Sequence, residues 1–446
     1  MDQATRRTRS SVIDRRRALQ LAAAGAGLAA LSLRAAAAQA DASPAASPVA
    51  ASEAPISGEA VAELADFDAL MTALMLKWTL PGGQLAIAHE GRLVYNRGFG
   101  YASVEDREVV TPDMTFRIAS VSKTITAVAI LKLVDAGELT LDTPVFPLLA
   151  LEGPPGSLRD PRLDTITIEH LLVHSGGWNS TAFDPQNVPM TLLASQVLRS
   201  ENPAEAETIV RYMLSQPLDF DPGSLSVYSN FGFNVLGRVI EHVSGQPYED
   251  YVKTQVLGPI GITTMAIGGT TLAERMPGEV RYYGSPEERP RESVFPGGDF
   301  GPPAYGAFYL RSLDAHGGWI AAAADLVRFT LAIDGTLGSA LLTPETVTAM
   351  ETTPRPSSEA SGAGNVDGGF GLGWYSVPVG AGYEWSHAGA LIGSTSAWLV
   401  RKPGGTVAAL AFNSQPQDAG GFFAEIIQAV QELLDGTTAW PARTTV

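Results

Sequence analysis

The sequence contains no cysteine among its 446 residues. This absence excludes disulfide bonds, a thiol nucleophile, zinc held by cysteines and a lipid anchor on an N-terminal cysteine. Hydrophobic residues make up 45% of the chain, which is enough for a large core to stabilise the protein without cross-links.

Positively charged residues are also scarce. The chain carries 30 lysines and arginines against 47 aspartates and glutamates, and its formal net charge is −17. An acidic chain without a basic stripe repels nucleic acid and anionic lipid. We therefore expect no nucleic-acid partner. The sequence gives no indication of the oligomeric state.

Long hydrophobic runs are missing as well. The weakly apolar N-terminal stretch, residues 21–33, is too short to span a membrane, and Arg34 follows it. Arginines at 15–17 precede this stretch, and an Ala-x-Ala cleavage pattern ends at Ala40. These features predict a twin-arginine-type signal peptide over residues 1–40. The expected product is periplasmic or secreted, without stable membrane insertion.

Composition divides the remainder of the chain in two. Residues 41–58 are rich in Ala, Pro and Ser and predict a flexible linker, and residues 59–440 predict the folded domain. Removal of residues 1–40 takes away seven arginines and two aspartates, which lowers the formal net charge from −17 to −22. This charge favours solubility and says nothing about the substrate.

Strands are predicted near both chain ends, with helices between them. The predicted strands cover residues 84–89, 92–99, 383–387, 394–401 and 406–413. The predicted helices cover residues 60–78, 122–137, 167–174, 204–215, 230–244, 248–256, 322–334 and, at the end of the chain, the apolar positions from 422 to 434. This order favours an α+β fold: one antiparallel sheet built from both chain ends, flanked by helices, with an inserted, mainly helical lobe. The Pro- and Gly-rich stretch 284–316 predicts a long loop over or near the functional site.

Only one of the five lysines has a serine three residues before it: Lys123 follows Ser120. Both residues stand where a loop meets a nearly all-apolar helical run, so they share one face of the first turn. A buried amine can lose its proton near neutral pH and act as a base toward the serine hydroxyl. The alternative is a helix-capping serine with a solvated lysine, but this helix offers few polar positions that could face water.

Two further elements could complete such a site. Tyr228 and Asn230 form the only Tyr-x-Asn sequence, at a loop–helix junction where a phenol and an amide can face a substrate. A packed tyrosine and a capping asparagine are the structural alternative. His387 and Gly389 lie on a predicted C-terminal strand, alternate onto one face, and leave room there for a substrate backbone.

These three elements occur in the order Ser-x-x-Lys, Tyr-x-Asn and Lys/His-x-Gly that serine β-lactamases and penicillin-binding proteins carry, and the chain resembles that family. The resemblance covers roughly residues 60–435. Within this range, the segment 116–123 is similar to the nucleophile segment of the class C β-lactamase-related hydrolases. The other segments that fit lie at 168–177, 222–223 and 236–241.

The resemblance implies a β-lactamase/transpeptidase-like fold and a role for each site residue. Ser120 would be the acylated nucleophile, Lys123 and Tyr228 would share proton transfer, and Asn230 would support the lysine and the substrate. His387 and Gly389 would lie beside the substrate. The backbone N–H groups of Ser120 and Ala390 would form the oxyanion hole. No metal or organic cofactor is implied.

One position departs from the pattern. Class C β-lactamases have lysine where this chain has His387, and the fixed positive charge there helps to hold the substrate carboxylate. A histidine is mostly neutral at pH 7, which weakens the case for β-lactam hydrolysis. Peptides of D-amino acids and carboxylic esters are therefore the first expected substrates, and β-lactams the second.

Three other interpretations are weaker. His170 and His174 have ligand-like spacing, but no obvious third metal ligand follows them. Ser175 lacks the Gly-x-Ser-x-Gly elbow of a Ser-His-Asp hydrolase. A catalytically silent protein of the penicillin-binding type, which only recognises cell-wall peptides, would have no need of a buried lysine beside the serine. The sequence therefore predicts a serine hydrolase that acts on a small-molecule or peptide substrate.

Overall fold

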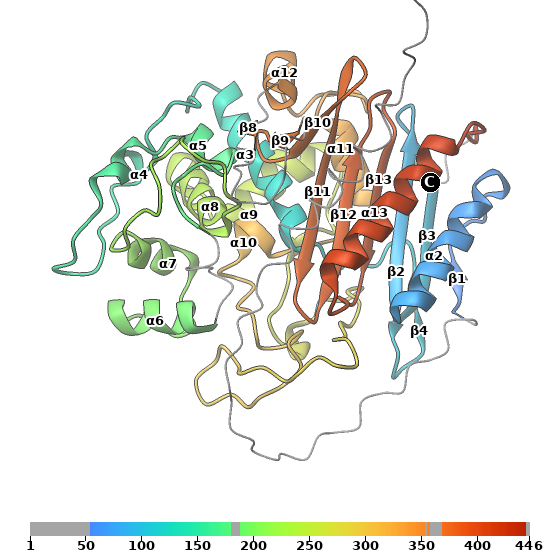
Figure 1. Ribbon diagram of the computed structural model, residues 1–446, viewed down its shortest axis with the longest axis horizontal. Helices are drawn as coiled ribbons and strands as arrows, with labels where there is room; N and C mark the ends of the chain where they lie inside the picture. The colour runs from blue at the N-terminus through green and yellow to red at the C-terminus, as the bar shows by residue number, and fades with distance from the viewer. Residues whose placement is uncertain (1–53, 180–187, 353–354, 357–367, 443–446) are drawn as a thin grey trace, which may run out of the picture.

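The computed structural model describes residues 54–179, 188–352, 355–356 and 368–442. The predicted signal peptide, residues 1–40, and most of the predicted linker lie outside the described residues. The described chain forms a sheet with a helical lobe on one side and two long helices on the other (Figure 1). Among the described helices, none has the length and apolar character needed to cross a bilayer.

Strands from both chain ends form the central sheet, as the sequence predicted. In spatial order these strands are β1 (Ile56–Ser57), β3 (Arg92–Ser103), β2 (Gly82–His89), β13 (Val407–Phe412), β12 (Thr395–Arg401), β11 (Gly382–Leu391), β10 (Tyr375–Val379), β9 (Gly369–Phe370) and β8 (Arg355–Pro356), with β4 (Glu108–Val109) paired to β3. All of these pairs are antiparallel. N-terminal β2 pairs with C-terminal β13, which joins the two ends of the chain.

The β2–β3 hairpin turns at Glu90 and Gly91. Both residues have positive φ, at 50° and 75°, the backbone that a two-residue turn between twisted strands requires. At the start of the described chain, β1 pairs Ile56 with Phe99. The sheet therefore begins at Ile56, within the segment 41–58 that was expected to be a flexible linker, because Ile56 and Ser57 pair with β3 as a short edge strand.

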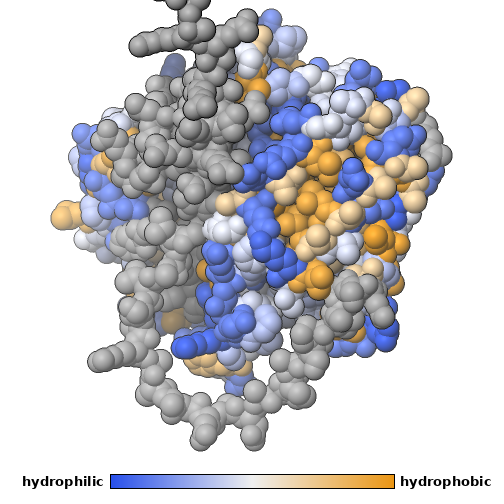
Figure 2. Space-filling view, turned by 45° about the vertical axis from the view of Figure 1, so that its right-hand side comes forward, coloured by the Kyte–Doolittle hydropathy of each residue, from blue (hydrophilic) through white to orange (hydrophobic). Residues whose placement is uncertain are grey.

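Two helices cover one face of the sheet: α2 (Ala65–Trp78) and α13 (Ala419–Gly436). Their apolar stripes form one continuous core with the facing side chains of β2, β12 and β13, including Phe67, Phe422 and Ile426. The outer side that these helices form mixes hydrophobic and hydrophilic side chains (Figure 2). A second, larger core lies between the other face of the sheet and the helical lobe.

The lobe contains α3 (Ser122–Asp135), α4 (Val145–Leu149), α5 (Ile168–Leu172), α6 (Val188–Leu198), α7 (Ala206–Met213), α8 (Asn230–Ser244) and α9 (Tyr248–Tyr251), which continues as a π-helical turn over Val252–Leu257. Closer to the sheet lie α10 (Asp314–Gly317), α11 (Ala323–Ala332) and α12 (Pro344–Thr352). Helix α3 is buried on nearly every side, as its apolar sequence predicted. Helices α4, α6, α10 and α12 were not predicted.

A small second sheet positions the segment before α3. Its strands are β5 (Phe116–Arg117), β7 (Trp319–Ala321) and β6 (Ala266–Ile267). The buried guanidinium of Arg117 donates hydrogen bonds to the Ala304 and Gly269 carbonyls and to Ser394. Arg117 thus ties the β11–β12 turn and the irregular segment 284–313 to the start of α3. The predicted loop 284–316 contains no helix or strand up to residue 313, but its last three residues belong to α10 and correct the prediction there.

Candidate active site

Ser120 lies at the junction of a 3₁₀ turn, Ala119–Val121, and α3. Ala119, immediately before it, has a φ of 46°, an unfavourable backbone for a residue with a side chain. Such strain concentrates at functional sites, where the surrounding structure holds it. The serine is 8% exposed, and Lys123 on the next turn is fully buried with its Nζ 3.2 Å from the serine Oγ.

The amine of Lys123 is held by two further acceptors. Its Nζ lies 2.7 Å from the side-chain oxygen of Asn230 on α8 and 2.8 Å from the backbone oxygen of His316 on α10. A neutral amine has two hydrogens and one lone pair. When the two hydrogens are donated to these acceptors, the lone pair is directed toward Ser120, which is the geometry of a base acting on its hydroxyl.

Helix α10 is fixed from both sides, and this fixes the carbonyl of His316. On one side, the buried Arg238 of α8 donates to Asp314 over 2.6 Å. On the other, Thr126 of α3 donates to the Ala315 carbonyl over 2.6 Å. A backbone acceptor such as the His316 carbonyl carries no sequence signal, and sequence analysis did not identify it.

Asn230 is the first residue of α8, and the cap is Ser229, whose hydroxyl accepts from the Gly232 N–H. The asparagine amide is therefore not used as a cap and faces Lys123. The backbone N–H of Ser229 donates to Nδ1 of His174 over 3.1 Å, which anchors the start of the helix to the segment after α5.

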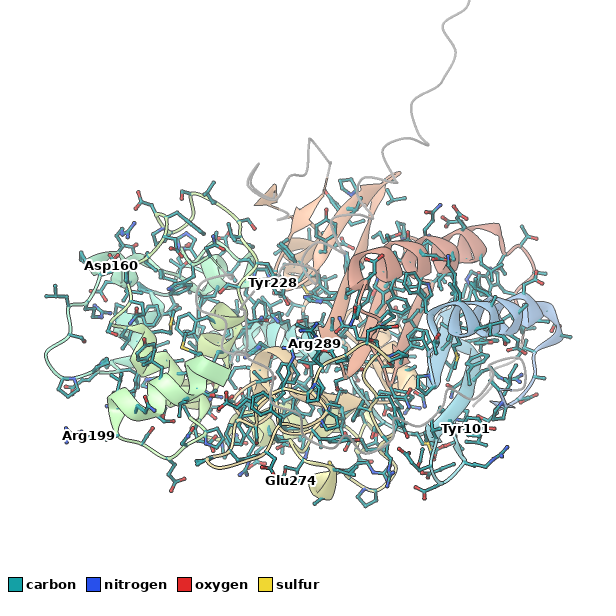
Figure 3. The ribbon with its side chains drawn as sticks, turned by 60° about the horizontal axis from the view of Figure 1, so that its bottom comes forward. Tyr101, Asp160, Arg199, Tyr228, Glu274 and Arg289 are labelled. Atoms are coloured by element: carbon teal, nitrogen blue, oxygen red, sulfur yellow. The ribbon has the colours of Figure 1, made fainter. Side chains whose placement is uncertain are left out.

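Tyr228 is half-buried between the helical lobe and the sheet (Figure 3). Its ring lies 4.8 Å from Lys123 Nζ, measured to the ring centroid, and 4.6 Å from the ring of His174. When the amine is protonated, the cation and the ring face attract each other at this distance. The structure thus brings Ser120, Lys123, Tyr228 and Asn230 together from two segments of the chain.

His387 lies on β11 with its ring centroid 6.4 Å from that of Tyr228. Burial and the nearby charge of Lys123 lower the pKa of His387 to about 3, so the imidazole is neutral at pH 7. The ring cannot supply the fixed positive charge that lysine provides at this position in class C β-lactamases.

The strand β11 passes directly behind the nucleophile. A Cβ built on Gly389 would lie 3.1 Å from the backbone nitrogen of Ser120 and would collide with the carbonyl oxygen of Ile118. Only glycine allows this approach. Ala390, the next residue, packs its methyl group toward α2 and α13 on the opposite face of the sheet.

Other histidines and tryptophans have structural positions. His170 takes part in the capping box of α5 with Thr167, while His174 accepts from Ser229, so the two rings have separate partners. No group of three potential metal ligands occurs among the described residues. Four tryptophans are buried in the larger core: Trp178, Trp319, Trp374 and Trp385.

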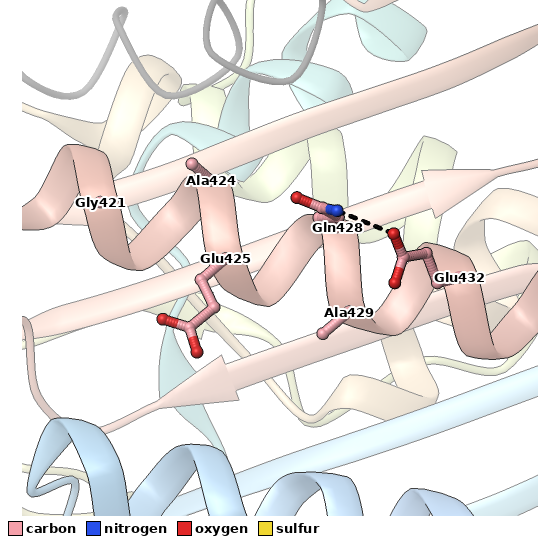
Figure 4. A pocket seen from close by; sticks show the side chains of 6 residues that line it. All are labelled: Gly421, Ala424, Glu425, Gln428, Ala429 and Glu432. Atoms are coloured by element: carbon pink, nitrogen blue, oxygen red, sulfur yellow. Dashed lines mark hydrogen bonds between the residues drawn. The ribbon is translucent and has the colours of Figure 1, made fainter. Parts of the chain in front are cut away.

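A depression of about 450 Å³ lies elsewhere, on the surface of α13 (Figure 4). Glu425, Gln428 and Glu432 line it, and Gln428 donates to Glu432 over 2.7 Å. Because α13 covers the face of the sheet opposite the helical lobe, this depression is separate from Ser120. It contains no nucleophile paired with a base.

Comparison with known proteins gives a match to a family model described as Beta-lactamase, over residues 67–431. Esterase EstB from Burkholderia gladioli is 33% identical over 204 residues, which cover 46% of this chain and 51% of the esterase. The Staphylococcus aureus protein flp (strain COL) is 27% identical over 44% of this chain and 36% of its own. The chain thus matches about half the length, or less, of these curated relatives.

Solved structures share the fold over most of the chain. The structure of SurE is 26% identical with a TM-score of 0.60, and the alignment covers 86% of this chain and 78% of SurE. The D-amino acid amidase of Ochrobactrum anthropi SV3, complexed with L-phenylalanine amide, is 22% identical with a TM-score of 0.64 over 84% of this chain and 98% of the amidase. These similarities confirm the predicted β-lactamase/transpeptidase-like fold.

Proposed function

Because the chain belongs to the beta-lactamase family, we propose that it is an exported serine hydrolase that forms an acyl-enzyme on Ser120 with amide or ester substrates. The observation that carries this proposal is the buried Lys123 amine, 3.2 Å from the Ser120 hydroxyl and anchored by Asn230 and His316. A merely structural lysine has no reason to face a strained serine in this way.

In the acylation step, Ser120 Oγ attacks the substrate carbonyl carbon while its proton passes to the amine of Lys123. The backbone N–H groups of Ser120 and Ala390 are proposed to stabilise the oxyanion. The intermediate collapses when the leaving nitrogen or oxygen takes a proton from the Lys123/Tyr228 pair. This step breaks the amide or ester bond and leaves the acyl group on Ser120.

Deacylation follows the same path with water as the nucleophile. Water attacks the acyl carbonyl and gives a proton to the Lys123/Tyr228 pair, and collapse returns a proton to Ser120 and releases the acid. Each proton removed is returned, so the cycle needs no cofactor.

Carboxylic esters and D-amino-acid amides or peptides are the proposed substrates, ahead of β-lactams. The similarity to the esterase EstB supports the ester, and the similarity to SurE, solved with D-Leu, and to the D-amino acid amidase supports the D-amino-acid group. The neutral His387 argues against tight binding of a β-lactam carboxylate. Export rests on the predicted signal peptide, residues 1–40, and the proposed mature enzyme begins with the linker 41–58, followed by the domain 59–440.

Product formation tests the proposal. The mature protein and its Ser120→Ala variant are each incubated with a short-chain aryl ester, a D-Ala-D-Ala peptide and a penicillin. Turnover by the wild type and not by the variant supports the proposal, and the substrate that reacts identifies the class. If neither protein reacts, a silent recognition protein is favoured. If both react equally, the nucleophile is another residue.

A further inference from the structure

The ring of His387 is fixed in one tautomer. Its Nδ1 lies 2.7 Å from the backbone oxygen of Ala388, and a carbonyl oxygen can only accept a hydrogen bond. The Nδ1 atom therefore carries the proton, and the Nε2 atom of the neutral ring presents a lone pair. The residue is only 5% exposed, and this Nε2 has no hydrogen-bond partner among the residues that the structure describes. A buried acceptor without a partner is unfavourable, and a ligand that donates a hydrogen bond to it removes that penalty.

The position of His387 places this acceptor at the active site. Side chains alternate along β11, so His387 and Gly389 share the face toward the helical lobe, while Ala388 and Ala390 pack toward α2 and α13. Gly389 touches the backbone of Ser120, as described above. The unpartnered Nε2 therefore belongs to a group two residues from the contact with the nucleophile, on the same face of the strand.

The charges around the ring keep it an acceptor. The Lys123 amine lies on the same side of the sheet and disfavours a second positive charge on His387, as does burial. His174, also buried in this region, has a pKa lowered well below its usual value by burial and by Lys123. A substrate carboxylate placed at Nε2 would face a lone pair and no proton, whereas an N–H or O–H group would find its acceptor.

We propose that Nε2 of His387 binds a hydrogen-bond donor of the substrate beside the scissile bond, so that the site selects neutral, donor-bearing groups such as primary amides over carboxylates. This inference rests on the proposed function, because it assigns the substrate group that this same site receives. It reverses the preference expected when a lysine occupies the position.

Three ligands of nearly equal shape distinguish the effect of a hydrogen-bond donor on binding from the effect of a negative charge. N-acetyl-D-alanyl-D-alanine has a terminal carboxylate, its C-terminal amide is neutral and donates, and its methyl ester is neutral without a donor. Their binding to the Ser120→Ala variant is measured by calorimetry, where no turnover interferes. We expect the amide to bind roughly tenfold more tightly than either of the others.

Two double variants act as controls. The variant Ser120→Ala/His387→Phe keeps an aromatic ring but has no ring nitrogen. In it, the affinity advantage of the amide over the methyl ester should fall below about twofold. In Ser120→Ala/His387→Lys, the carboxylate should become the tightest ligand. Circular dichroism confirms that each variant is folded.

The inference would be overturned if the amide and the methyl ester bound equally well, or if the acid bound most tightly while His387 is present. It would also be overturned if none of the three ligands bound. None of these results depends on hydrolysis. The proposed function fails separately, when the wild-type protein forms no acyl adduct at Ser120 with an activated ester.

Discussion

The amine of Lys123 donates a hydrogen bond to the side-chain oxygen of Asn230, 2.7 Å away, across the interface between α3 and α8. These residues are 107 positions apart in the chain. The contact places a fixed acceptor beside the proposed base, and the consequences of changing either residue follow from that geometry.

Replacement of Lys123 by methionine should remove the base and keep most of the buried volume. We expect kcat on an aryl ester to fall by about 10² to 10⁴-fold, the usual contribution of general-base catalysis. Lys132 offers a matched control on the same helix, because its amine lies at the far end of α3 and donates to the Leu341 carbonyl. Lys132→Met should retain activity within about twofold of the wild type. Similar losses in both variants would show that the effect is structural.

The Asn230→Asp variant tests the electrostatic part of the same contact. A carboxylate beside Lys123 stabilises the ammonium form, so the neutral base becomes available only at higher pH. The rising limb of the pH–kcat/KM profile should therefore move to higher pH by about one unit or more. The profile is measured with a neutral ester to avoid titration of the substrate. An unchanged profile with a uniformly lower rate would contradict a role of Lys123 as the base.

Gly389→Ala should damage the site through the backbone of the nucleophile. The added methyl group would collide with the carbonyl oxygen of Ile118 and lie 3.1 Å from the Ser120 nitrogen, and neither backbone atom can move without displacing the 3₁₀ turn. We expect a loss of activity of about a hundredfold or more. Gly436→Ala, where nothing lies within 4 Å of the new carbon, serves as the control and should be active. Full activity of Gly389→Ala would contradict the close packing of β11.

Buried histidines should make the fold sensitive to mild acid. Burial lowers the pKa of His174 and His316 well below the usual value, and that of His387 to about 3. Below pH 6.5 these groups bind protons in the unfolded chain and not in the folded protein, so stability is lost as the pH falls toward the folded-state pKa. Each group contributes about 1.4 kcal/mol per pH unit in that window.

Urea unfolding at several pH values between 5 and 7.5 measures this slope. The variant His316→Gln keeps the backbone carbonyl that receives Lys123 and removes one titrating ring. Its slope should be smaller than that of the wild type by about 1.4 kcal/mol per pH unit below pH 6. The same slope in both proteins would show that His316 does not titrate on unfolding in this range.

Much of the architecture was predictable because the terminal strands and helices carry regular apolar patterns. The prediction missed α4 because its five residues are too few to show a helical repeat of apolar side chains. It missed β1 because Ile56 gains its partner, Phe99, only in the folded sheet. It also missed several strands of only two residues, which leave no alternation to detect: β4, β5, β6, β8 and β9.

The site was predictable only in part from local spacing. Ser120 and Lys123 are one helical turn apart, so their contact is local and visible in the sequence. Asn230 and His387 lie on distant segments, and only the resemblance to a known family placed them together. The His316 carbonyl and its support by Arg238 and Asp314 could not be predicted, because a backbone acceptor and a long-range ion pair have no sequence pattern.

The most direct test of the account is to locate the acyl group. The mature wild-type protein is mixed with an aryl ester, quenched in acid within milliseconds to seconds, and analysed by intact mass and peptide mapping. The account predicts a mass increase of one acyl group on the peptide that contains Ser120, and none in Ser120→Ala. An acyl group on another residue, or hydrolysis that persists in Ser120→Ala, would contradict it.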